Sequence, residues 1–123
     1  MIAAIAIVGC GVLTDAATRL AFEIEAAVRR LGSEDGASYT VRHVVERKPG
    51  EPHGPSTVQL DKVGALIVWC RDAEDKVLSS HSTTHHGRFV DTRETFIVNK
   101  PAGGVLIIRL ERQQGRAVIV SVL

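Results

Sequence analysis

The sequence predicts one α+β domain, in which a long N-terminal amphipathic helix packs on a curved, largely antiparallel sheet. We expect about five to seven strands, closed as a cone or partial barrel. Three observations support this. The chain has 123 residues, the length of one domain. One segment has the apolar spacing of a helix. The remaining apolar segments are short and are mostly separated by turn-forming residues.

The clearest predicted element is the helix, which runs to about Leu31. Thr14 or Asp15 can cap its start, and Gly32 follows its end. Its apolar positions follow the i, i+3, i+4, i+7 stripe of a helix buried on one side. They are Ala17, Leu20, Ala21, Ile24, Ala27, Val28 and Leu31. The charged residues Arg19, Glu23, Glu25, Arg29 and Arg30 occupy much of the remaining surface.

Before the helix, residues 2–8 form an apolar run that ends at Gly9-Cys10-Gly11. We expect a buried strand, with an N-terminal extension of the helix as the alternative. The two glycines look like half of a dinucleotide-binding turn, but Thr14 replaces the third glycine of that fingerprint. A glycine-rich turn between strand and helix is therefore the preferred interpretation.

The N-terminal apolar run is too short for a membrane span, which needs about 20 residues. It also lacks the basic start of a secretory signal. We therefore expect a cytoplasmic protein whose two cysteines, Cys10 and Cys70, are small buried residues.

Two predicted strands flank a long loop. Residues 39–47 alternate, with Tyr39, Val41, His43 and Val45 on one face. Residues 46–56 carry three prolines and two glycines, so they predict an exposed loop. The second strand is the apolar run of residues 63–70. Leu66, Val68 and Cys70 would share one of its faces, and Ala65, Ile67 and Trp69 the other.

The rest of the chain predicts further strands. A turn at residues 72–75 leads to a returning strand that starts at residues 76–80, and the stretch 79–86 is polar on both faces. The apolar pattern resumes at Phe89 and Val90 and again at residues 96–98. The chain closes on a hairpin of residues 105–111 and 116–123.

This closing hairpin is apolar on both faces. One face would hold Leu106, Ile108, Leu110, Val118, Val120 and Val122, and the other Val105, Ile107, Ile119 and Leu123. One helix covers only one face. The second face therefore predicts closure of the sheet or a partner subunit, and we expect a homodimer or higher homo-oligomer.

Charge and composition exclude some partners. The net charge is +1 and aromatic residues make up 4%. A nucleic-acid-binding protein usually has a basic surplus, and single-stranded nucleic acid needs aromatic stacking platforms. We therefore expect neither nucleic acid nor a membrane as partner.

The histidines suggest a metal site as a weak alternative. His81, His85 and His86 lie within six residues. On an extended strand His81 and His85 share a face but stand about 13 Å apart, too far for one metal ion unless the strand bends. Polar decoration of a hairpin tip or edge is the preferred interpretation. The sequence identifies no cofactor.

Acid–base chemistry on a small ligand is the leading functional hypothesis, because a curved sheet packed on a helix makes a pocket. The candidate catalytic residues are His43, His81, His85, Asp91 and Glu94. The candidate ligand-binding residues are Tyr39, Trp69 and Arg93. Arg93 and Glu94 are more often surface charges, and Trp69 more often packs in a core or interface.

The sequence thus predicts a small-molecule-binding domain that acts as a homo-oligomer. It is either non-catalytic or a cofactor-independent acid–base enzyme. The alternatives are a non-catalytic protein–protein assembly module and a metal-dependent enzyme that uses the three clustered histidines.

Overall fold

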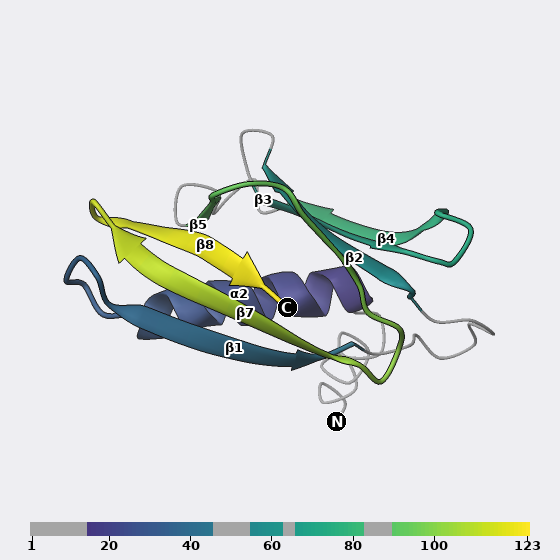
Figure 1. The fold of residues 1–123 in the computed structure, drawn as a ribbon, viewed down its shortest axis with the longest axis horizontal. Helices are drawn as coiled ribbons and strands as arrows, with labels where there is room; N and C mark the ends of the chain where they lie inside the picture. The colour runs from purple at the N-terminus through teal and green to yellow at the C-terminus, as the bar shows by residue number, and fades with distance from the viewer. Residues whose placement is uncertain (1–14, 46–54, 63–65, 83–89) are drawn as a thin grey trace, which may run out of the picture.

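The computed structural model describes residues 15–45, 55–62, 66–82 and 90–123. These residues form one helix and eight strands (Figure 1). The α+β class is confirmed, and most strand pairs are antiparallel. Instead of the single curved sheet that the sequence predicts, the strands divide between two four-stranded sheets. One of them is mixed, because β5 (Val90–Thr92) pairs with β8 (Arg116–Val122) in parallel.

Helix α2 spans Ala16–Arg30, within one residue of the expected bounds. Asp15 caps it, since its side chain accepts a hydrogen bond of 2.8 Å from the amide of Thr18. Its buried face is the predicted stripe. The buried residues are Ala17, Leu20, Ala21, Ile24 and Ala27.

The first sheet, sheet A, has the order β1-β7-β8-β5. It combines β1 (Ser38–Val44), β7 (Val105–Gln113), β8 and β5. The second sheet, sheet B, has the order β4-β3-β2-β6. It combines β4 (Val77–Ser82), β3 (Leu66–Arg71), β2 (Thr57–Lys62) and β6 (Phe96–Asn99).

Strand β2 was not predicted as a separate strand, because the sequence analysis recognised only the apolar run that follows it. It pairs antiparallel with both β3 and β6. Val58 and Leu60 are buried, while their neighbours Thr57, Gln59 and Asp61 are half-exposed. This is the alternation of a strand with one face on a core. Strand β3 has the predicted phase, with Leu66, Val68 and Cys70 buried.

The expected phase of β8 is wrong over its first half. Ala117, Ile119 and Val122 are buried, while Val118 and Val120 are half-exposed and face outward. The pairing with β7 shifts register between Arg109 and Leu110. This bulge reverses which side chains of β8 face the core. Strand β7 keeps the predicted phase, with Leu106, Ile108 and Leu110 fully buried.

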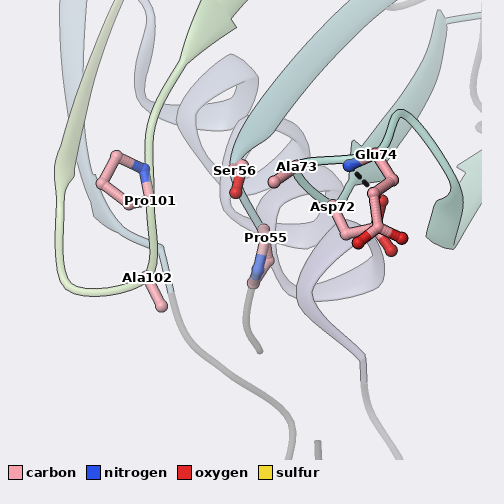
Figure 2. A pocket seen from close by; sticks show the side chains of 7 residues that line it. All are labelled: Pro55, Ser56, Asp72, Ala73, Glu74, Pro101 and Ala102. Carbon is pink, nitrogen blue, oxygen red and sulfur yellow. Dashed lines mark hydrogen bonds between the residues drawn. The ribbon is translucent and has the colours of Figure 1, made fainter. Parts of the chain in front are cut away.

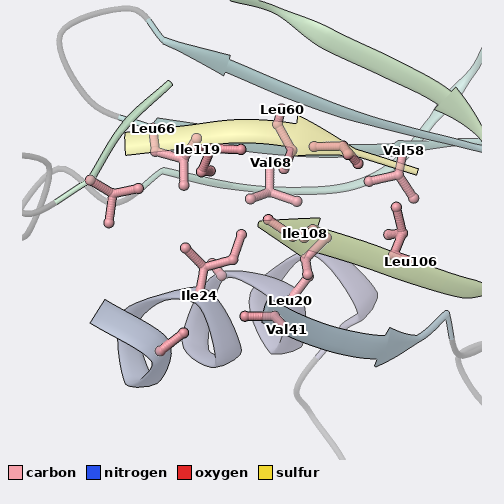
Figure 3. Close-up of a cluster of buried hydrophobic side chains, with 14 of the residues drawn as sticks. Leu20, Ile24, Val41, Val58, Leu60, Leu66, Val68, Leu106, Ile108 and Ile119 are labelled. Carbon is pink, nitrogen blue, oxygen red and sulfur yellow. The ribbon is translucent and has the colours of Figure 1, made fainter. Parts of the chain in front are cut away.

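The helix and the inward faces of both sheets enclose one hydrophobic core. Helix α2 contacts β1 of sheet A and β3 and β4 of sheet B. Figure 3 shows Leu20 and Ile24 pointing from the helix toward Val68 and Ile108. All four side chains are at most 1% exposed. Close-packed side chains therefore occupy the space between the helix and the sheets, and concave surface is found at the margins of the fold.

Candidate functional site

A groove of about 160 Å³ lies between helix α2 and strand β1. Eight residues line it, four from each element. They are Glu23, Ala26, Ala27 and Arg30 from the helix and Tyr39, Thr40, Val41 and Arg42 from the strand. This α2/β1 groove contains one of the predicted ligand-binding residues, Tyr39, and ends beside a predicted catalytic residue, His43.

The sequence of the helix explains why the groove is hollow. Glu23, Ala26, Ala27 and Arg30 follow the i, i+3, i+4, i+7 spacing, so they form one stripe along the helix. The two alanines in the middle of this stripe have only methyl side chains. Longer side chains stand at the two ends, so volume remains between helix and strand.

Polar contacts between helix and strand mark the two ends of the groove. At one end the carboxylate Oε2 of Glu23 lies 2.7 Å from Nδ1 of His43. At the other end Nη1 of Arg30 donates a hydrogen bond of 3.4 Å to the hydroxyl of Tyr39. The groove is therefore bounded by an acidic residue at one end and a basic residue at the other.

His43 belongs to the buried face of β1, and its side chain is 4% exposed, against 47% for Glu23. A buried imidazole needs a hydrogen-bond partner, and the helix supplies it. The carboxylate of Glu23 thus touches both the groove and a buried imidazole. Such a pair can hold a proton beside a bound molecule, as general acid–base catalysis requires.

A second hollow, of about 460 Å³, lies where the start of β2 meets two turns (Figure 2). Its lining residues are Pro55, Ser56, Asp72, Ala73, Glu74, Pro101 and Ala102. Asp72 Oδ1 accepts hydrogen bonds of 2.9 Å from the amides of Glu74 and Lys76. Its carboxylate therefore stabilises the turn between β3 and β4, and none of the predicted site residues lines this hollow.

Asp91 joins the two sheets. Its carboxylate lies 2.5 Å from Lys62 Nζ of β2 and 3.1 Å from Arg116 Nη1 of β8. The hydrogen bond from Lys62, with a smaller contribution from Arg116, holds the pKa of Asp91 below its ordinary value, although partial burial opposes the shift. The carboxylate thus binds two cations at the sheet junction, where the three charges sum to +1, away from the α2/β1 groove.

His81 lies on β4 and contacts a different flank of the helix. Its Nδ1 is 3.3 Å from the hydroxyl of Thr18, and its ring meets Phe22 edge-on with centroids 5.6 Å apart. His85 and His86 lie outside the described residues. Within the part of the chain that the structure describes, no three His, Cys, Asp or Glu side chains are grouped so that they could hold a metal ion.

The remaining predicted residues lie elsewhere. Trp69 is half-exposed on the outer face of sheet B, with the guanidinium of Arg71 5.5 Å from its ring centroid. Arg93 and Glu94 are exposed. The amide of Arg93 donates a hydrogen bond to the carbonyl of Ile119, and the carbonyl of Glu94 accepts one from the hydroxyl of Thr92. The structure does not bring these residues to the α2/β1 groove.

Sequence reasoning missed the three charged residues of the groove, Glu23, Arg30 and Arg42, because charges on a helix or strand usually face solvent. One signal was present. Two alanines stand between Glu23 and Arg30 on a single helical stripe, which predicts a shallow hollow between charged ends. Residues 2–8 and the Gly9-Cys10-Gly11 turn lie outside the described residues.

No protein-family model, no curated protein and no solved structure matches this chain. The candidate site is therefore chosen from its geometry. None of the helical structure in the described residues has the length and hydropathy of a membrane-spanning segment.

Proposed function

We propose that the protein is a small-molecule-binding domain whose site is the α2/β1 groove, and that its ligand carries a carboxylate. The observation that supports this is a hollow with an alanine floor between polar ends. Arg30 lines one end of it, and guanidinium groups are the strongest side-chain partners of carboxylates. The Glu23–His43 pair at one end would serve a proton transfer in an acid–base enzyme.

The size of the groove limits the ligand. Sites for drug-sized molecules have volumes of about 300–1,000 Å³. A groove of about 160 Å³ suits a short aliphatic molecule and is too small for a nucleotide or a flavin.

The test is an NMR titration of ¹⁵N-labelled protein with valerate. We expect saturable shifts in the amides of residues 23–30 and 39–42. Ala26→Leu fills the half-buried floor of the groove and should abolish the shifts. Arg29→Leu adds a similar side chain on an exposed site of the same helix outside the groove and should preserve them. Shifts that persist in Ala26→Leu, or that map elsewhere, would overturn the proposal.

A second candidate function is self-assembly through the outer face of sheet A. Val105, Ile107, Val118 and Val120 are only partly buried there, and Val44 and Leu123 are 52% and 68% exposed. A two-fold pair presents the same patch twice. Arg109 and Glu111 beside the apolar strip have opposite signs and pair at 3.4 Å, so their charges offset each other. Arg42, which lies opposite Ile107 in the pairing of β1 with β7, adds an exposed positive charge at the patch.

Native mass spectrometry of the tag-free protein tests this assembly and also detects a retained ligand. We expect a dimer that Ile107→Lys converts to a monomer, while Ile97→Lys, at an exposed isoleucine of sheet B, leaves it intact. A wild-type protein that stays monomeric at its highest soluble concentration would rule out the assembly.

A further inference from the structure

The two ends of the α2/β1 groove carry opposite charges at a defined separation. Glu23 and Arg30 stand seven residues apart on one stripe of the helix. A rise of about 1.5 Å per residue places their Cα atoms roughly 10 Å apart along the helix axis. The groove is thus an elongated site with a carboxylate at one end and a guanidinium at the other.

Among the described residues, strand β1 contacts both charged groups and engages only part of their hydrogen-bonding capacity. The contact with His43 engages one oxygen of Glu23, and the contact with Tyr39 engages one nitrogen of Arg30. A carboxylate can accept about four hydrogen bonds and a guanidinium can donate five. The strand therefore orients both groups without saturating them.

Between the charged ends the groove is apolar on its floor. Ala26 and Ala27 contribute methyl groups from the helix, and Val41 contributes its side chain from the strand. A chain of methylene groups could lie along this floor, since apolar atoms prefer contact with other apolar atoms to contact with water. A ligand that is polar in its middle would lose hydrogen bonds to water there.

We infer that the groove selects a linear dipolar molecule, an aliphatic ω-amino carboxylate, with its carboxylate on Arg30 and its ammonium on Glu23. This inference rests on the proposed function and specifies the ligand class for the same groove.

The test compares ligands on the wild-type protein by NMR titration. The probes are δ-aminovalerate, valerate, which lacks the amine, and pentylamine, which lacks the carboxylate. A second series of glycine, γ-aminobutyrate and ε-aminocaproate varies the distance between the two charges. We expect δ-aminovalerate to bind about fivefold more tightly than valerate, the size of one exposed ion pair. Glycine, which is too short to reach both ends, should bind weakest of the amino acids.

Charge-removing variants then test which charged group of the ligand binds at each end of the groove. Glu23→Gln should remove the advantage of δ-aminovalerate over valerate, and Arg30→Gln its advantage over pentylamine. Glu34→Gln and Arg29→Gln remove the same charges at exposed sites outside the groove and should change neither ratio. If Glu23→Gln fails to fold, the comparison of the three probes on the wild-type protein is by itself the test of the dipolar ligand.

The outcomes separate the two proposals. Valerate binding as tightly as δ-aminovalerate would overturn the dipolar ligand while leaving the carboxylate site in place. Binding of none of the probes in the groove would overturn both. An advantage of δ-aminovalerate that survives Glu23→Gln would place the ammonium elsewhere and would also overturn this inference.

Discussion

His43 and His81 contact two different flanks of the same helix. His43, from sheet A, lies 2.7 Å from Glu23, and His81, from sheet B, lies 3.3 Å from Thr18. Between these flanks the helix buries Leu20 and Ile24 in the common core. Each sheet thus contributes one imidazole that fixes the helix laterally, while apolar burial holds it against the core.

Removing the carboxylate partner of His43 should destabilise the fold. Glu23→Ala leaves a buried imidazole without this hydrogen bond, which costs about 1–3 kcal/mol in the free energy of unfolding. Urea unfolding measures this. The double variant with His43→Leu should be less destabilised than the sum of the two single variants, because the orphaned polar group is then absent. Additive effects would show that the contact contributes no coupling energy.

The acid sensitivity of the protein should depend on Asp91. The pKa of Asp91 in the folded state is lowered chiefly by its hydrogen bond from Lys62. A lowered folded-state pKa stabilises the protein above the ordinary value of 3.8 and loses that contribution as the pH falls through the folded-state value. The stability difference between wild type and Asp91→Asn should therefore shrink from about pH 5 to about pH 3.

Urea unfolding at several pH values tests this dependence. Asp75→Asn, whose side chain is 85% exposed in the wild type, is the matched control and should follow the wild-type profile. A difference between wild type and Asp91→Asn that stays constant with pH would contradict the assignment.

The helix should lose stability when its N-cap is removed. Asp15 accepts the amide hydrogen of Thr18, so Asp15→Ala leaves that donor unpaired and should cost about 1 kcal/mol. Asp15→Asn keeps an oxygen acceptor and should retain most of the stability. Thermal unfolding followed by circular dichroism compares the three proteins, and equal melting temperatures for wild type and Asp15→Ala would refute the cap.

The core should be far more sensitive than the outer face of the helix. Ile24 is fully buried, and Ile24→Ala should cost about 2–5 kcal/mol by removing apolar contacts and leaving a cavity. Phe22 is 53% exposed, so Phe22→Ala should cost far less although it removes more atoms. The opposite ranking in urea unfolding would mean that the helix packs with a different face.

Local patterns were sufficient to predict the helix, and long-range pairing limited the rest. The apolar stripe from Ala17 to Leu31 is set by a period of 3.6 residues, so it can be recognised without knowing its partner. The phase of β8 depends on a register shift against β7, which no local pattern in Val118–Val122 reveals. The division into two sheets likewise follows from which strands pair.

The candidate site shows the same limit. His43 and Tyr39 were recognised because imidazole and phenol groups on an alternating strand are chemically conspicuous. Their partners Glu23 and Arg30 come from the helix, and only the packing of α2 on β1 reveals them. A groove between two elements is a property of tertiary packing.

The position of α2 also has a consequence for solubility. Strands β1 and β4 are outer strands of their sheets, and such edges invite pairing with other chains. The helix contacts both of them, so a single element protects two strands through which molecules could aggregate. A substitution that loosened the helix would uncover both edges together, and strand exchange between molecules would then compete with refolding.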